Sequence, residues 1–197
     1  MQFKVKVVGV EQAQKRLEAQ AEKIDPGVRG ALNTTATHTR AEMYVKPMAT
    51  ALTGKKTRSR MVIKRANSRW IQSRIIPSSS GVEVLEYRRW GYDPIEKTRG
   101  RIWVRGPSGR KVAAGFVNPS GRKKKPLITK SEKARNLKRP PKFDQRKSYL
   151  YKKPLQDALG PSVAYWFKQL TTLRTINWVN AYLQQEFNKR LQKELLK

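Results

Sequence analysis

Few residues in this chain could carry out catalytic chemistry. His38 is the only histidine, and the 197 residues include no cysteine. A serine, histidine and aspartate triad would need His38, and no serine lies in a nucleophile-elbow sequence. Glu83 and Glu86 lie three apart in a predicted strand, so they face opposite ways and are interpreted as surface charges. We expect His38 to be packed or hydrogen-bonded, and we predict no catalytic residue, no metal site, no cofactor and no enzymatic activity.

Two glycine-containing segments resemble nucleotide-binding loops only in composition. Residues 54–57, Gly-Lys-Lys-Thr, have a lysine where a phosphate-binding loop has its hydroxyl residue. Gly100, Gly106 and Gly109 lack the spacing of a dinucleotide fingerprint and are predicted to be turn residues. Neither segment predicts nucleotide chemistry.

The positive charge of the chain is concentrated in one region. Forty-four Lys and Arg against 14 Asp and Glu give a net charge of +30. Residues 97–153 hold twenty of these basic residues and two of the acidic ones, a net of +18. Within them, residues 118–148 contain only five apolar side chains, too few to offset the entropy of ordering. We predict that residues 118–148 form a basic arm that contacts DNA or an acidic neighbour through Arg122, Lys123, Lys124, Lys125, Lys138, Arg139 and Lys142.

The first part of the sequence is predicted to contain one strand and two helices. Residues 3–7 alternate between apolar and lysine side chains, in the period of a half-buried strand. Apolar residues at helical spacing predict an amphipathic helix over about residues 11–24. Asp25 followed by Pro26 is a typical helix start, so a second helix is predicted from there. Pro47 is expected to kink or end it, because proline removes a backbone donor.

The central part is predicted to form an antiparallel, meandering sheet. Residues 70–76 and 82–90 are interpreted as two neighbouring strands. Residues 102–104 and 112–117 flank a connector rich in turn residues and are predicted to form a hairpin. Residues 56–67, before this sheet, are predicted to be basic and helical.

Helices are predicted again in the last part of the sequence. A capping box predicts one short helix at residues 130–138, inside the arm. The triplet at residues 160–162, Gly-Pro-Ser, is predicted to open another short helix. A longer amphipathic helix follows, and its apolar stripe is predicted to be a subunit interface. The residues of this stripe are Ile176, Val179, Leu183, Phe187 and Leu191.

These elements together predict an α+β fold. It comprises a mainly antiparallel sheet packed by helices, an extended basic arm and a C-terminal amphipathic helix. The predicted division is an α+β core over residues 1–117, the arm or insertion over 118–148, and a return to the core with the C-terminal helices over 149–197. No apolar run approaches the roughly 18 residues of a membrane helix, so neither membrane insertion nor secretion is expected.

The order of these elements resembles the bacteriophage minor tail protein Z family, the tail completion proteins. The resemblance rests on the opening strand and helix, on residues 31–36, and on a basic-Pro-Leu stretch that leads to Gly-Pro-Ser-Val. Residues 118–148 depart from the pattern, because this insertion is longer and more basic than the resemblance leads us to expect. The residues of the last motif are Lys153, Pro154, Leu155, Gly160, Pro161, Ser162 and Val163.

The resemblance implies a structural virion protein that completes the tail at its head-proximal end and helps to join it to the head. The implied partners are tail terminator or tail-tube proteins, head-neck connector proteins and genomic DNA in the channel. A homo-oligomeric ring is implied, with six-fold symmetry as the expectation. The implied location is the tail and neck of the virion, and the host cytoplasm during assembly.

Composition also fits another class of protein. A ribosomal or other RNA-binding protein, whose lysine-rich arms run among phosphates, would show the same charge profile. Both alternatives stay open on charge alone.

Overall fold

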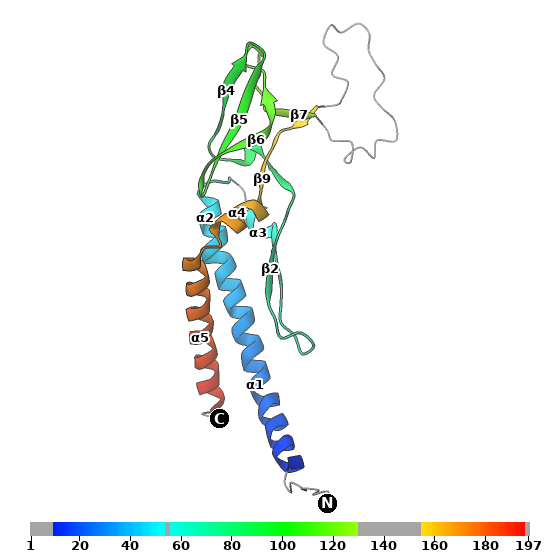
Figure 1. Ribbon diagram of the computed structural model, residues 1–197, viewed down its shortest axis with the longest axis vertical. Helices are drawn as coiled ribbons and strands as arrows, with labels where there is room; N and C mark the ends of the chain where they lie inside the picture. Colours follow the sequence, from blue (N-terminus) through cyan, green and yellow to red (C-terminus); the bar gives the residue numbers. More distant parts are fainter. Residues whose placement is uncertain (1–9, 54–55, 130–154, 196–197) are drawn as a thin grey trace, which may run out of the picture. The chain divides into compact units, whose positions relative to one another are not determined.

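The computed structural model describes residues 10–53, 56–129 and 155–195, and it has an α+β fold (Figure 1). The predicted fold class, in which helices accompany antiparallel sheet, is confirmed. The chain divides into two compact units, each built from segments that are distant in the sequence. Of the described residues, 10–41, 62–76 and 172–195 form what we call the helical unit, and 42–53, 56–61, 77–129 and 155–171 form the sheet unit.

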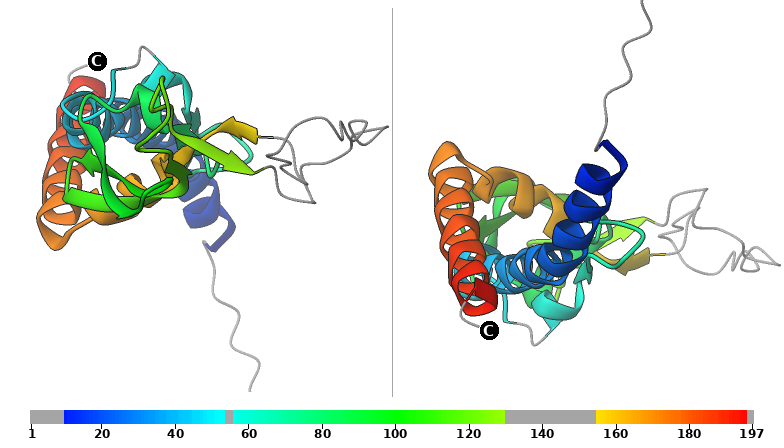
Figure 2. Two further views of the ribbon diagram at one scale, coloured as in Figure 1. Left: turned by 90° about the horizontal axis from the view of Figure 1, so that it is seen from above. Right: turned by 90° about the horizontal axis from the view of Figure 1, so that it is seen from below.

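The helical unit contains two long helices and most of a two-stranded hairpin. The helices lie side by side, as the views from two directions agree (Figures 1 and 2). They run antiparallel, because contacts early in one helix are made with residues late in the other. The elements are α1 (Val10–Thr39), α5 (Leu173–Leu195), β1 (Met61–Lys64) and β2 (Arg74–Pro77).

Helix α1 continues without a break through Pro26, so the predicted division into two helices is wrong. A new helix would need the Asp25 side chain to cap its first turn. The Asp25 carboxylate instead pairs with the Arg29 guanidinium one turn later, at 3.2 Å. Arg29 Nε also lies 3.4 Å from the Asp25 carbonyl oxygen, to which it donates a hydrogen bond. The acidic residue therefore stabilises a helix interior and not a helix start.

The helical path changes geometry after α1. A π-helix, η1 (Arg40–Val45), leads into the short helix α2 (Lys46–Ala49). Pro47 lies in the first turn of α2, where a backbone N–H has no intrahelical partner and its loss costs little. The end predicted at Pro47 is thus displaced by two residues, to Ala49.

Residues 56–77 form a pattern different from the predicted one. The helix predicted over residues 56–67 is only one turn long, α3 (Lys56–Ser59), and the chain then enters β1. Strand β2 begins at Arg74 instead of residue 70, and it pairs with β1. The β-branched pair Val62 and Ile63 suits an extended strand, where its side chains pack on a pleated surface.

The strand predicted over residues 82–90 is also divided. It becomes β3 (Gly81–Glu83), the 3-10 turn η2 (Val84–Glu86) and the first residue of the next strand. Strand β3 pairs antiparallel with β9 (Leu159–Ser162), from much later in the sequence, and not with β2. The predicted pairing of neighbouring strands is therefore wrong here.

The five-stranded sheet has the predicted antiparallel meander. Its strands are neighbours in sequence order, and the predicted hairpin is confirmed as its second and third strands. Strand β7 (Leu127–Thr129) lies inside the segment assigned to the arm, so part of that segment belongs to the sheet. The predicted strand at residues 3–7 and short helix at 130–138 lie outside the described residues. The strands are β4 (Trp90–Glu96), β5 (Arg99–Gly106), β6 (Gly109–Val117), β7 (Leu127–Thr129) and β8 (Leu155–Asp157).

Gly115 allows β7 to approach β6. Its φ of +115° lies in a region that side chains with a Cβ rarely adopt. A Cβ at this position would also collide with the Leu127 carbonyl oxygen. The absence of a Cβ at Gly115 therefore leaves room for the backbone of β7 beside β6.

The core of the sheet unit lies where alternate residues of β5 meet helix α4 (Val163–Leu170). Every second residue of β5, from Gly100 to Gly106, is buried, as expected for a strand with one face toward the core. The larger buried side chains of this unit are Met48, Met61, Val82, Val84, Tyr87, Ile102, Val104, Val117, Pro126, Val163 and Trp166.

Candidate functional sites

The Gly-Pro-Ser-Val motif joins strand β9 to helix α4. Gly160 crosses the face of Tyr87, where a Cβ would lie 2.8 Å from a ring carbon. Ser162 Oγ accepts a hydrogen bond of 3.2 Å from the backbone N–H of Tyr165 and so caps α4. Val163 is fully buried. The predicted helix start at residues 160–162 is thereby confirmed, and we call this segment the β9–α4 joint.

A buried hydrogen-bond chain completes the joint. Trp166 Nε1 donates to Tyr87 Oη at 2.8 Å, and Tyr87 Oη donates to the Pro161 carbonyl oxygen at 2.7 Å. Tyr87 and Trp166 are each only 2% exposed, so the indole N–H and the phenol rely on these hydrogen bonds for their partners. Gly106 of β5 leaves the space that the indole occupies, because a Cβ there would overlap the ring.

The Tyr87 hydroxyl makes stability depend on pH in the alkaline range. Burial raises the pKa of Tyr87 from 10.0 to about 12, and the hydrogen bond from Trp166 opposes this rise. As the pH rises from about 10 to about 12, the unfolded chain loses this proton while the folded chain keeps it. Stability should therefore fall across this window, by about 2 to 3 kcal/mol at its upper end.

Urea unfolding at about pH 9 and about pH 12 measures this decline. The variant Tyr87→Phe lacks only the phenol at position 87 and is the control for the lysines and the other six tyrosines, which also titrate there. An equal decline in the variant and the wild type would show that Tyr87 is not its source.

Residues 31–36, the other segment of the resemblance, also take part in packing. The Asn33 side chain donates to the Ala66 carbonyl oxygen at 3.1 Å and accepts from the Ala66 N–H at 2.8 Å. Thr34 Oγ1 accepts a hydrogen bond of 2.8 Å from Arg190 Nη2 of α5. This segment of α1 therefore holds both the hairpin and the other helix. Its buried residues are Ala31, Thr35 and Ala36.

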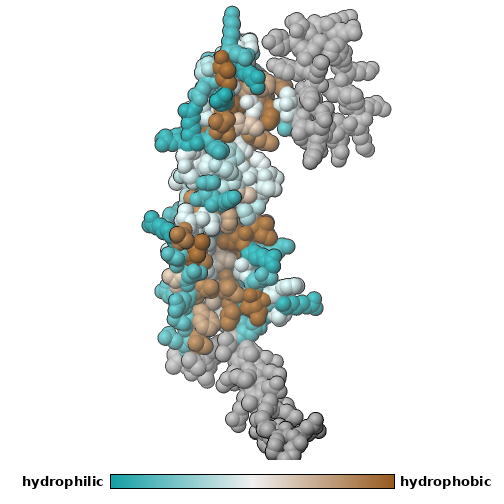
Figure 3. All heavy atoms as spheres, viewed as in Figure 1, coloured by the Kyte–Doolittle hydropathy of each residue, from teal (hydrophilic) through white to brown (hydrophobic). Residues whose placement is uncertain are grey.

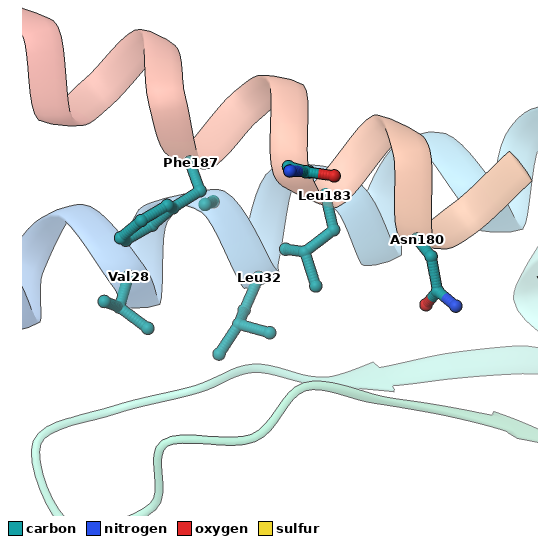
Figure 4. A pocket seen from close by; sticks show the side chains of 7 residues that line it. Val28, Leu32, Asn180, Leu183 and Phe187 are labelled. Atoms are coloured by element: carbon teal, nitrogen blue, oxygen red, sulfur yellow. The ribbon is translucent and has the colours of Figure 1, made fainter. Parts of the chain in front are cut away.

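The predicted subunit stripe of α5 is partly used inside the helical unit. Leu183 and Phe187 line a groove with Val28 and Leu32 of α1, and the cavity measures about 290 Å³ (Figure 4). Ile176, near the start of α5, is 44% exposed. The stripe therefore has a part that packs on α1 and a part that is exposed. Its other two members, Val179 and Leu191, are half-buried.

His38 is packed, as the sequence indicates. Its ring stacks on Tyr182, with centroids 4.6 Å apart, and on Trp178, with centroids 5.6 Å apart. Among the described residues, no group of three or more His, Cys, Asp or Glu is placed to hold a metal ion. No helix in the described ranges is long and apolar enough to cross a bilayer.

The two candidate glutamates differ in their surroundings. Glu83 is exposed, as predicted. Glu86 is instead a partly buried ion-pair partner, because its carboxylate lies 3.0 Å from the Arg60 guanidinium. The interpretation of Glu86 as a surface charge is therefore wrong. Its partner, Arg60, lies 26 positions earlier in the sequence, so local spacing could not predict the ion pair.

Only part of the predicted basic contact set can be placed. Arg122, Lys123 and Lys124 are exposed in the connection between β6 and β7. Lys125 pairs with Asp157 of β8, with 2.6 Å between Nζ and Oδ1. The four residues therefore do not act as one uniform cluster. Lys138, Arg139 and Lys142 of the arm, and Lys153 and Pro154 of the motif, lie outside the described residues, while Leu155 opens β8.

A second basic surface was missed by the sequence analysis. It lies at the loop between β1 and β2, where a cavity of about 460 Å³ is lined by basic, amide and indole side chains. A signal was available, because residues 43–82 contain nine Lys and Arg and no Asp or Glu. The larger excess of positive charge in residues 97–153 drew the prediction to that region instead. The lining residues are Lys64, Arg65, Asn67, Trp70, Gln72 and Arg74.

No protein-family model matches this chain, and neither a curated protein nor a solved structure matches it. The resemblance to tail completion proteins thus stays a prediction that rests on the residues of the chain itself.

Proposed function

We propose that this chain is a structural, non-enzymatic subunit of a bacteriophage virion, which completes the tail at its head-proximal end. The observation that carries the proposal is the β9–α4 joint. The residues Gly160, Pro161, Ser162 and Val163, on which the resemblance rests, each contact or cap a neighbouring element. The resemblance therefore concerns residues that specify the fold of the subunit.

Two surfaces support an assembly role. Exposed Ile176 extends the apolar stripe of α5 beyond its contacts with α1, which suits a contact between copies in a ring. The exposed basic residues 122–124 suit an anionic neighbour, either DNA in the channel or an acidic face of a neck protein. Tail terminator, tail-tube and head-neck connector proteins are the proposed protein partners, in the virion and during assembly in the host cytoplasm.

Deletion of the gene from its phage tests the role directly. Because the proposed role is architectural, the lysate should contain DNA-filled heads and separate tails, and the infectious titre should fall by orders of magnitude. Electron microscopy of particles, with and without the protein supplied from a plasmid, measures this outcome.

Normal joining in the absence of the protein, with a defect in genome processing, would contradict the structural role. Recovery of the purified protein with ribosomal RNA after high-salt washing would favour the RNA-binding alternative instead.

A further inference from the structure

The hairpin of β1 and β2 carries exposed apolar side chains on a basic surface. Trp70 is 63% exposed and Ile71 is 56% exposed, both in the loop at residues 65–73, which we call the hairpin loop. Apolar residues also reach the surface elsewhere, beside hydrophilic ones (Figure 3). An indole ring this exposed presents a flat face that is available to a ligand.

Basic side chains surround this indole. Lys64, Arg65 and Arg74 line the cavity of about 460 Å³ together with Trp70, and Arg69 precedes the indole in the loop. Within the described part of the chain, none of these four cations forms an ion pair with a carboxylate. The surface therefore has uncompensated positive charge, which favours an anionic ligand.

The backbone of the hairpin loop is held in place before any ligand binds. Asn67 Oδ1 accepts hydrogen bonds from the N–H groups of Arg69 (3.0 Å) and Trp70 (2.9 Å). The backbones of Asn67 and Trp70 also bond to each other in both directions. Asn33 of α1 anchors the loop at Ala66 through two further hydrogen bonds. Such preorganisation lowers the entropy that binding would otherwise cost.

We propose that the hairpin loop binds single-stranded nucleic acid. One unpaired base stacks on the Trp70 indole, and the flanking phosphates contact Lys64, Arg65, Arg69 and Arg74. Cationic grooves with stacking aromatic rings are how proteins hold single strands without sequence preference. A duplex keeps its base faces covered and would use only the cations, so the exposed indole favours the single strand. This inference does not depend on the proposed role in the virion.

The experiment measures fluorescence anisotropy of labelled single strands of roughly 12 nucleotides, with the full chain, over a series of salt concentrations. Both a deoxyribonucleotide and a ribonucleotide strand are used, since either source presents bases and phosphates. The matched ligand is an abasic strand of the same length. The wild type should bind the strands with bases more tightly than the abasic strand.

Trp70→Leu should weaken binding of the strand with bases about tenfold and abolish the preference over the abasic strand. Leucine keeps an apolar side chain but has no aromatic face. Trp70→Phe, which keeps an aromatic ring, should retain most of the affinity. Because Trp70 is mostly exposed, both variants should keep the thermal unfolding transition of the wild type.

Arg65→Ser with Arg74→Ser tests the phosphate contacts. On a single strand, the slope of log K against log salt should become shallower by about 1.4, since each neutralised phosphate contributes about 0.7. Trp70→Leu should leave this slope unchanged, because stacking releases no counterions.

Wild-type affinity of Trp70→Leu for the strand with bases would overturn the proposal. It would equally be overturned if a duplex of the same length bound as tightly with no dependence on Trp70. Polyglutamate and vesicles containing phosphatidylserine complete the experiment. If either binds with the Trp70 dependence and the nucleic acid does not, the surface serves an acidic protein or a membrane instead.

Discussion

A Tyr87→Phe variant should lower the free energy of unfolding by about 2 to 4 kcal/mol, although it removes only one oxygen atom. The Tyr87 hydroxyl accepts a hydrogen bond from the Trp166 indole and donates one to the Pro161 carbonyl. Phenylalanine leaves the buried Trp166 N–H and the partly buried Pro161 carbonyl without these hydrogen bonds, and each such group costs about 1 to 3 kcal/mol. Urea unfolding near neutral pH, followed by circular dichroism, measures the change.

Tyr165→Phe is the matched control for this variant. Tyr165 packs edge-on against the same indole, with ring centroids 4.9 Å apart, but its hydroxyl takes no part in the buried chain. Its loss should change stability by less than about 0.5 kcal/mol. Combining Tyr87→Phe with Trp166→Phe should cost less than the sum of the two single changes, because the second removes the orphaned N–H. Strict additivity would mean that the two residues do not form the bond.

A Leu183→Asp variant should lose about 2 to 4 kcal/mol of stability and should no longer assemble. Leu183 lines the apolar groove between α5 and α1, beside Phe187 and opposite Val28 and Leu32. A carboxylate there loses hydration without gaining a partner, which weakens the packing of the two helices. Thermal unfolding and sedimentation velocity of the purified protein measure the two effects.

Two further aspartate variants separate folding from assembly. Gln185→Asp changes an exposed position on the same helix and should alter neither property. Ile176→Asp introduces the same charge at a side chain that is 44% exposed, so it should leave stability intact and reduce assembly. A Leu183→Asp protein that unfolds and sediments like the wild type would remove α5 from the proposed interface.

The sequence pattern correctly predicted those elements whose structure depends on residues close together in the sequence. The hairpin of β5 and β6 was predictable because two short apolar runs flank a connector of turn residues, from Gly106 to Gly109. The start of α4 was predictable because Ser162 is a typical N-cap residue just before the helix. Helix α5 was predictable from its apolar period.

The sequence pattern gave wrong predictions where an element pairs or packs with a segment that is distant in the sequence. The strand after residue 80 was expected to pair with its predecessor, yet β3 pairs with β9. Pro26 was expected to begin a new helix, yet α1 continues through it, and Asp25 pairs with Arg29 one turn later. Helical spacing placed Leu183 on an apolar stripe but could not show that this side chain packs against α1.

The sequence by itself determined the charge, the single histidine, the mixed class of the fold and the apolar face of each long helix. Only the tertiary structure decided which segment covers each face, that Glu86 pairs with Arg60, and that Trp70 stands exposed among cations. The physical reason is that periodicity and capping act over a few residues. Burial and ion pairing instead depend on groups brought together from distant parts of the chain, and no local window contains both partners.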